Sequence, residues 1–362
     1  MNFPVMYKKS KKAVLQQWQI FIEGNTYFTE AGQVGGAITQ SLPTEVLGKN
    51  AGKANETSDT EQTLKEVLAI ITKQKEKGYN EDVKDAGKVD YFKPMLAKNF
   101  NDYKDRISYP VISQIKIDGI RSILTSKGMF TRTGKPILAC PHIFELLKKH
   151  FIADPSLILD GELYSHGLNR DFDTLVSLIK KSKPTQEDLE ESKKYIQYWI
   201  FDIPSNKTFS ERFKFVDKLV DNKYIIKVES TYCNNQKDLD RSYEKYLEDG
   251  FEGQMIRTNS KYENCRTQAL LKRKEHQDEE FKIVDVVEGV GNWVGAAGAV
   301  VLTNKNGVEF KATPKMTYEL KKELLRNKHE IIGQMGTVRF QNYTPDSLVP
   351  RFPRFLTVRD YE

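Results

Sequence analysis

Cysteine is scarce in this chain of 362 residues, which contains only three, Cys140, Cys233 and Cys265, at distant positions. Because no two of them form a C-x-x-C pair, the sequence offers neither a disulfide framework nor a four-cysteine zinc site. The five histidines show no metal-ligand spacing either. The simplest expectation is a reducing compartment and a function that does not depend on zinc.

Long apolar runs are also missing, so we expect no membrane-spanning segment and no membrane partner. The N-terminus is apolar first and basic second, the reverse of a secretory signal, which favours a cytoplasmic location. Hydrophobic residues make up 39% and charged residues 29% of the chain, a composition typical of a soluble globular protein. The net charge of +6 suits a polyanionic partner but is too small to identify one.

Arginine is absent up to Lys88, and acidic and basic residues are balanced over the same segment. A glycine-rich aromatic stretch (18–36) is followed there by a helical pattern from Thr57 to Gly78. We therefore expect a small α+β module over residues 1–88, joined to the rest of the chain by the polar residues 80–88.

Two further segments follow from the pattern of apolar residues. In 89–277 short strands alternate with turns and a few helices, whereas in 278–362 the helical signal mostly disappears. The second pattern is typical of a small Greek-key β-barrel. The expected strands lie near 111–117, 120–125, 157–164, 196–203, 281–288, 298–303, 307–312 and 335–341, and the expected helices near 142–151, 209–220, 237–248 and 317–328.

The most informative segment is 114–121, which reads Gln-Ile-Lys-Ile-Asp-Gly-Ile-Arg. A lysine on a buried β-branched strand is expensive to keep charged, and its neutral amine is a usable nucleophile. The pair Asp118-Gly119 predicts a sharp turn that brings Arg121 back towards whatever Lys116 attacks. The alternative, for this motif taken alone, is a surface strand that ends in a turn.

Acidic residues follow at two later positions. Strand alternation places Asp160 and Glu162 on one face, where the carboxylates repel unless a cation, a sugar hydroxyl or a lysine lies between them. Glu252 precedes Gly253 at the start of a strand, where a ligand can approach the backbone closely. A surface ion-pair strand and a strand-end cap are the alternative interpretations.

A basic strand completes the set. Lys272 and Lys274 share one strand face while Arg273 takes the other, and two neighbouring ammonium groups suit a phosphate chain. Alone, this strand would be a solvated basic edge. Transfer of a nucleotidyl group requires an activated nucleophile, acidic residues that can hold a metal and cations that bind phosphate. The sequence offers a candidate for each of these.

From residue 90 to 362 the order of these segments resembles the ATP-dependent DNA ligases, in the covalent nucleotidyltransferase superfamily that includes RNA ligases and mRNA capping enzymes. The resemblance implies an α+β fold: a nucleotidyltransferase domain of antiparallel sheets with flanking helices over 89–277, then a C-terminal OB-fold β-barrel over 278–362, preceded by the small α+β N-terminal module. It is carried by residues 116–121, 131–136, 160–162, 201–202, 252–253 and 272–274, and by Arg351-Phe352-Pro353-Arg354-Phe355 with Arg359.

The resemblance also implies roles for individual residues. Lys116 would carry AMP, and Gln114 would contact the adenine amino group. The expected catalytic residues are Lys116, Asp118, Arg121, Lys272 and Lys274. The expected nucleotide-binding residues are Gln114, Ile115, Lys116, Arg121, Arg132, Glu162, Phe201, Glu252, Lys272, Lys274, Arg351 and Arg359, and the expected metal-binding residues are Asp118, Glu162 and Glu252.

The function implied is sealing of 3′-hydroxyl/5′-phosphate nicks in duplex DNA, with ATP, Mg²⁺ or Mn²⁺, a lysyl-AMP and a DNA-adenylate. The expected partner is nicked double-stranded DNA, encircled by a single chain. Residues 1–88 resemble the WGR-type nucleic-acid modules through Trp18, Gly24, Gly32 and the stretch Lys49-Asn50…Lys53…Asn55-Glu56-Thr57, and would complete such a clamp; the alternative is a structural or protein-docking module. Two alternatives remain: an RNA ligase or GTP-dependent capping guanylyltransferase, and a non-catalytic nucleic-acid-binding protein.

Overall fold

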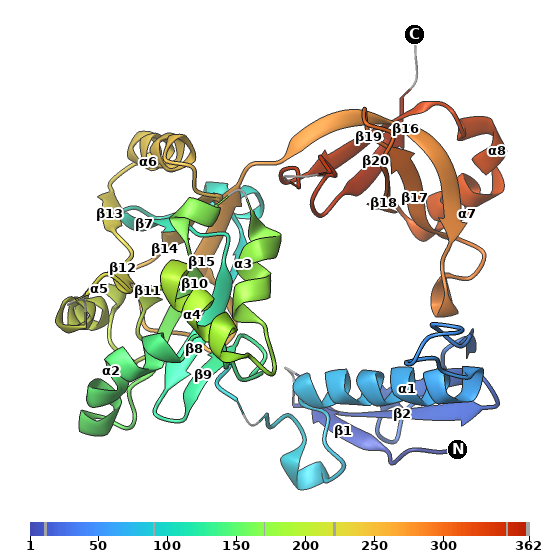
Figure 1. The fold of residues 1–362 in the computed structure, drawn as a ribbon, viewed down its shortest axis with the longest axis horizontal. Coiled ribbons are helices and arrows are strands. Elements are labelled where there is room, and N and C mark those ends of the chain that lie inside the picture. Colours follow the sequence, from blue (N-terminus) through green and yellow to red (C-terminus); the bar gives the residue numbers. More distant parts are fainter. Residues whose placement is uncertain (11–12, 90, 170, 220–221, 345–346, 360–362) are drawn as a thin grey trace. The chain divides into compact units, whose positions relative to one another are not determined.

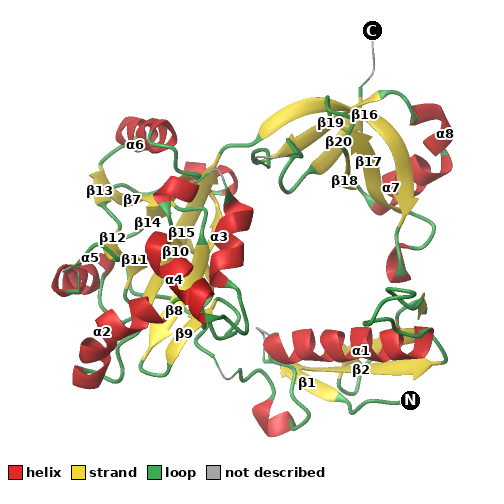
Figure 2. Ribbon diagram, in the orientation of Figure 1, coloured by secondary structure: helices red, strands yellow, loops and turns green. Residues whose placement is uncertain are grey.

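The computed structural model describes residues 1–10, 13–89, 91–169, 171–219, 222–344 and 347–359. The chain divides into two compact units, one built on residues 91–276 and the other on the N-terminal segment, residues 277–343 and the C-terminal segment. Both helices and strands occur in each of the two units (Figure 1, Figure 2). Among the described residues, no helix is long and apolar enough to cross a bilayer.

The N-terminal segment forms an antiparallel sheet with one long helix, α1 (Asp59–Glu76), lying along it (Figure 1). Trp18, Ile20 and Ile22 alternate on one face of the sheet and pack with Val67 of the helix. A capping box of Ser58 and Glu61 starts α1. The predicted α+β module is confirmed. Its strands are β1 (Met6–Lys9), β2 (Leu15–Glu23), β3 (Thr26–Gln33), β4 (Ile38–Gln40) and β5 (Thr44–Glu45).

Two five-stranded sheets form the central unit, in the orders β12-β11-β10-β8-β9 and β13-β7-β14-β15-β6. Ile112 of the second sheet and Leu124 and Leu163 of the first belong to one buried apolar cluster, so both sheets share a core. The strands are β6 (Leu96–Asn99), β7 (Val111–Lys116), β8 (Ile120–Thr125), β9 (Gly128–Thr131), β10 (Leu159–Tyr164), β11 (Gln197–Asp202), β12 (Ile225–Lys227), β13 (Ser230–Cys233), β14 (Gly253–Arg257) and β15 (Arg266–Lys274).

The helices expected near 142–151 and 237–248 are present, whereas two further helices, over 172–179 and 186–195, were not among those expected. The helix expected over 209–220 is only α5 (Phe209–Phe213) and continues as a 3₁₀ turn (Lys214–Lys218). The tighter turn has three residues per repeat and so directs both Phe213 and Val216 into the core. The other helices are α2 (Pro141–Ala153), α3 (Phe172–Ile179), α4 (Gln186–Tyr195) and α6 (Gln236–Glu248).

The C-terminal strands close into a barrel in the order β16-β17-β18-β20-β19, and its helical segment lies between β18 and β19. This is the five-stranded arrangement of an OB fold, as expected. The predicted helix over 317–328 is interrupted at Asn327. The elements are β16 (Gln277–Glu288), β17 (Ala297–Thr303), β18 (Glu309–Pro314), α7 (Tyr318–Arg326), α8 (Lys328–Ile331), β19 (Met335–Phe340) and β20 (Arg354–Val358).

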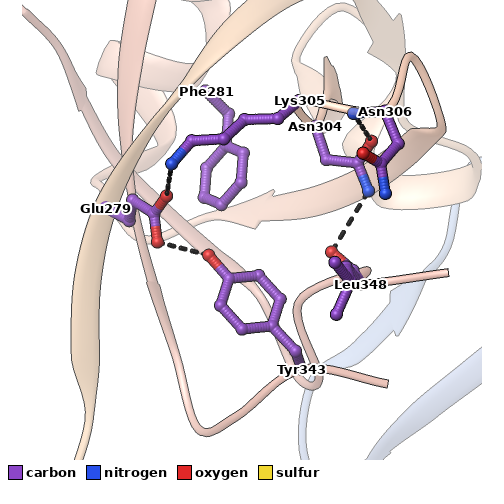
Figure 3. Close-up of a pocket in the computed structure, with 7 residues that line it drawn as sticks. All are labelled: Glu279, Phe281, Asn304, Lys305, Asn306, Tyr343 and Leu348. Atoms are coloured by element: carbon purple, nitrogen blue, oxygen red, sulfur yellow. Dashed lines mark hydrogen bonds and ion pairs between the residues drawn. The ribbon is translucent and has the colours of Figure 1, made fainter. Parts of the chain in front are cut away.

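A pocket of about 220 Å³ opens on this barrel (Figure 3). At one side the Tyr343 hydroxyl donates to Glu279, and Lys305 Nζ lies 3.7 Å from the same carboxylate (Figure 3). At the other, the Asn304 amide donates to the Leu348 carbonyl oxygen at 3.1 Å. The site residues expected from the sequence, all of which are described, are not among those that line it.

Candidate active site

Lys116 is the last residue of β7, the second strand of its sheet, which lies between β13 and β14. The antiparallel register places Gly253 opposite Lys116, and Lys274 opposite Gly253 on the next strand. One step along, Met255 lies opposite Gln114, and Lys272 opposite Met255. Because side chains two residues apart share a face, Gln114, Lys116, Lys272 and Lys274 occupy one face of the sheet.

The face prediction for the basic strand is therefore confirmed, and Arg273 does take the opposite side. Its guanidinium donates to Asp240 at 2.6 Å and lies 4.0 Å from the centre of the Tyr243 ring. Burial lowers the pKa of Lys272, and the charges of Lys274 and Lys116 lower it further. The three lysines are thus close enough to repel one another, which favours a polyanionic ligand among them.

Glu252 is the direct partner of the candidate nucleophile. Its carboxylate forms an ion pair with Lys116 and accepts a second hydrogen bond from Lys274 Nζ at 3.3 Å. The Lys116 side chain is 20% exposed and that of Glu252 only 6%, so the pair is sheltered but open to a ligand. The sequence predicted a nucleophilic lysine and a cationic strand, and the structure adds this carboxylate between Lys116 and Lys274.

Two glycines allow the close backbone approaches on which this arrangement depends. At Gly253, where φ is +154°, an added Cβ would lie 2.3 Å from the Arg273 carbonyl oxygen. At Gly119 an added Cβ would lie 2.5 Å from the Leu163 carbonyl oxygen and 2.7 Å from Glu162 Cγ. The Asp-Gly turn after Lys116 therefore packs directly on β10, the strand that carries Glu162.

Arg121 lies opposite Glu162 on neighbouring strands and binds Asp160 with two hydrogen bonds, Nε to Oδ1 at 2.8 Å and Nη2 to Oδ2 at 2.6 Å. The Tyr262 hydroxyl donates to the same carboxylate at 2.7 Å. Burial alone would lower the pKa of Arg121, but the Asp160 charge raises it above its ordinary value. The Asp160 carboxylate is thus already bonded to other side chains of the protein. Of the two acidic residues on β10, Glu162 is therefore the better candidate to bind a ligand.

Glu162 has an unusual protonation equilibrium. Burial raises its pKa to about 8, the charges of Lys116 and Arg121 oppose the shift, and those of Asp160 and Glu252 add to it. A carboxyl group crowded by other acids in a low-dielectric site is stabilised by a bound cation.

Gln114 and Phe201, two of the expected nucleotide-binding residues, lie next to each other. The Gln114 amide nitrogen donates to the Phe201 carbonyl oxygen at 3.2 Å and to the Ser230 hydroxyl at 3.0 Å. The Phe201 ring lies 5.4 Å from the Arg121 guanidinium. Sequence reasoning missed Arg257 and Ser230, which contact Gln114 from distant strands and follow no recognisable spacing.

The remaining expected residues are Ile115, Arg132, Arg351 and Arg359. Ile115 packs against the main apolar cluster, and Arg132 is exposed in the turn after β9. Arg351 and Arg359 belong to the barrel, where Arg351 donates to the Asn342 side chain at 3.1 Å and Arg359 pairs with Glu280. The predicted roles of these four residues, like those of the other expected site residues, stay predictions.

Metal binding was expected at Asp118, Glu162 and Glu252. Within the described parts of the chain, no group of three or more His, Cys, Asp or Glu side chains could hold a metal ion by itself. Mg²⁺ in nucleotide sites usually takes one or two carboxylates and completes its shell with phosphate oxygens and water. Glu162 and Glu252, both close enough to Lys116 to act on it electrostatically, fit that smaller requirement.

Comparison with known proteins agrees with this geometry. The ATP dependent DNA ligase domain matches residues 94–274, and the DNA ligase OB-like domain matches residues 288–359. The DNA ligase of Haemophilus influenzae is 27% identical over 246 residues, which cover 66% of this chain and 83% of that protein. The DNA ligase of enterobacteria phage T4 is 23% identical over 302 residues, which cover 67% of this chain and 62% of the phage enzyme.

Among solved structures, one from a study of DNA binding by Lig E DNA ligases has the same fold. Its TM-score is 0.62 at 24% identity, with 74% of this chain and 98% of that chain covered. The first domain match spans half of the sequence by itself, and the second adds the barrel. The chain belongs to the family of ATP-dependent DNA ligases.

Proposed function

We propose that this ligase seals nicks in duplex DNA through an AMP carried on Lys116. The observation that supports the proposal most strongly is the ion pair between Lys116 and Glu252, on a sheet face that also carries Lys272 and Lys274. A nucleophile, a proton acceptor and two cations for phosphate are the minimum that transfer of a nucleotidyl group requires.

In the first step the Lys116 amine attacks the α-phosphorus of ATP. The nitrogen–phosphorus bond forms as the bond to the pyrophosphate oxygen breaks, and pyrophosphate leaves. The amine must give up a proton, and Glu252 is the adjacent carboxylate that can accept it. Lys272 and Lys274 stabilise the negative charge that develops on the phosphoryl oxygens.

Glu162 would hold Mg²⁺ or Mn²⁺ during this step, and Glu252 would join it once the Lys116 proton has left its carboxylate. When bound, the metal would neutralise charge on the phosphates and on the departing pyrophosphate. Phe201 and Gln114 contact the base, and Glu162 can also accept a hydrogen bond from a ribose hydroxyl. Crowded acids at this position are therefore useful once nucleotide and metal are bound, although they repel one another in the empty protein.

The later steps move AMP to DNA and then remove it. An oxygen of the 5′-phosphate at the nick attacks the AMP phosphorus, and the nitrogen–phosphorus bond breaks to restore Lys116. The neighbouring 3′-hydroxyl then attacks the 5′-phosphorus and expels AMP. These steps depend mainly on alignment of the two DNA ends. Asp118 lies in the turn beside Lys116, and Arg132, exposed after β9, would contact the ribose or phosphate of the nucleotide.

The test is incubation with labelled ATP and a divalent cation, followed by addition of a nicked DNA duplex. We expect wild type to form a labelled protein and to seal the nick, and Lys116→Ala to do neither. Lys127→Ala, which changes an exposed lysine in the turn between β8 and β9, is the control and should behave as wild type. A labelled adduct on Lys116→Ala would contradict the proposal.

Two further arms of the experiment separate the alternatives. Efficient labelling with GTP would favour a capping guanylyltransferase, and joining of single-stranded RNA ends in preference to nicked DNA would favour an RNA ligase. Nucleic-acid binding without any labelled protein would favour a non-catalytic role.

A further inference from the structure

Three buried residues, Asp202, Arg257 and Gln114, form a chain of hydrogen bonds that ends at the proposed nucleotide site with Gln114. We propose that Arg257, held by Asp202, is a positioning residue that fixes the Gln114 amide with its oxygen towards the nucleobase, and so makes the site select ATP over GTP. The inference rests on the proposed function, in which Gln114 contacts the base.

The Arg257 guanidinium group is held by two hydrogen-bond partners. Its Nε donates to Gln114 Oε1 at 2.6 Å, and its Nη1 donates to Asp202 Oδ2 at 2.6 Å. Asp202 is fully buried and also accepts two hydrogen bonds from Arg212, at 2.7 and 3.0 Å. Because Arg257 is itself only 3% exposed, it has no alternative polar environment to move into.

These neighbours decide which way the Gln114 amide points. A guanidinium only donates hydrogen bonds, so the Gln114 atom that faces Arg257 must be the amide oxygen. A backbone carbonyl only accepts, so the atom that faces the Phe201 oxygen at 3.2 Å must be the amide nitrogen. A flipped amide would place donor against donor and acceptor against acceptor.

The hydrogen-bonding capacity that the protein leaves unused on the Gln114 side chain is that of an acceptor. Both amide hydrogens are used, by the Phe201 carbonyl and by the Ser230 hydroxyl, whereas the oxygen keeps one lone pair beyond the bond from Arg257. Gln114 can therefore accept one more hydrogen bond and donate none. Adenine presents an amino donor at the position where guanine presents a carbonyl acceptor, so only adenine matches.

The arrangement also lies on the correct face of the sheet. On β14, Gly253 is opposite Lys116 and Met255 is opposite Gln114, so Arg257 is the next residue on the face that carries the nucleophile. The Arg257 guanidinium lies 5.7 Å from the centre of the ring of Phe201, an expected nucleotide-binding residue whose aromatic face can stack on a base. Arg257 thus supports both proposed contacts to the base without needing to touch it.

The experiment compares kcat/KM for protein labelling with ATP and with GTP in three variants. Arg257→Met removes the donor to Gln114 but leaves Asp202 paired with Arg212, so we expect the ATP-to-GTP ratio to fall by on the order of tenfold or more. Arg257→Lys keeps a cation beside Asp202 and should give an intermediate ratio. Arg212→Met removes the other arginine on Asp202 and is the matched control, with a lower melting temperature but an unchanged ratio.

A fall of the ratio confined to the Arg257 variants supports the inference, because loss of a merely structural residue would lower labelling with both nucleotides alike. An unchanged ratio in whichever Arg257 variant folds, checked by its melting transition, overturns it. Absence of any labelled wild-type protein would instead overturn the proposed function, and the inference with it.

Discussion

Single side chains in the site could be placed on the correct face from the sequence, but their partners could not. Strand alternation predicts that Lys272 and Lys274 point together and that Arg273 points away, and both statements are confirmed. The Lys116–Glu252 pair depends on the sheet register between β7 and β14, strands separated by more than a hundred residues. Local periodicity carries no information about such a register.

Burial raises the pKa of Glu162 from 4.5 to about 8, and this shift predicts that the stability of the protein depends on pH. Between these two pH values the folded protein holds a proton that the unfolded chain has lost, so the free energy of unfolding falls as the pH rises through this window. Glu162→Gln removes the effect. We expect its melting temperature to match that of wild type at about pH 5 and to exceed it increasingly up to about pH 9.

Differential scanning calorimetry over this pH range checks the prediction. Glu187→Gln, at an exposed position of α4, is the matched control, and its difference from wild type should not depend on pH in this way. A constant difference between Glu162→Gln and wild type from acid to alkaline pH would show that Glu162 is an ordinary carboxyl group.

Helices and strands with a strong hydrophobic periodicity were predicted from the sequence. Those that depend on contacts with distant segments were not. The barrel strands over 277–340 were expected, whereas β20 was recognised only as a motif containing Phe355. It becomes a strand because it pairs parallel to β18 and antiparallel to β19, which closes the barrel. The helix expected over 209–220 is also altered by contacts with distant segments, because Phe213 and Val216 are both buried in the core.

Gly253→Ala tests whether the contact between β14 and β15 positions the active site. The new Cβ would collide with the Arg273 carbonyl oxygen, 2.3 Å away, and the strands must separate beside Lys274 and Glu252. We expect a loss of about 1–3 kcal/mol in the free energy of unfolding, and at least a tenfold slower labelling by ATP. Chemical denaturation and single-turnover labelling measure the two effects.

Gly307→Ala is the matched control for Gly253→Ala. Gly307 also has a positive φ, of +75°, but an added Cβ would meet nothing within 4 Å. It therefore reports the backbone strain alone, and its labelling rate should stay at the wild-type value. Equal labelling rates for Gly253→Ala and wild type would mean that close contact between these strands is unnecessary for catalysis.

For the molecule as a whole, the order of its parts was predictable because each part has a distinct pattern: an arginine-free module, a region of alternating strands and helices, and a barrel. The nucleotidyltransferase and OB-like domains are confirmed by family matches, and both matches lie outside residues 1–88. The boundaries at 88 and 277 and the role of the N-terminal module stay predictions.

Deletion of residues 1–88 tests that role. The module has a core of its own around Trp18 and Val67, so its removal should leave labelling by ATP unchanged. If it adds a second DNA contact, affinity for nicked duplex at physiological salt should fall by about tenfold or more, because the two contacts reinforce each other. Binding and sealing measured side by side decide the matter, and equal sealing by the shortened chain would point to a docking function instead.

The central claim is that one amine, Lys116 Nζ, carries AMP. The most direct measurement is mass spectrometry of the purified protein after treatment with ATP and magnesium, and again after treatment with pyrophosphate, followed by mapping of the labelled peptide. The account predicts a gain of one AMP, located on the peptide that contains Lys116 and removed by pyrophosphate. An AMP found on any other residue, or a protein whose mass never changes, would contradict it.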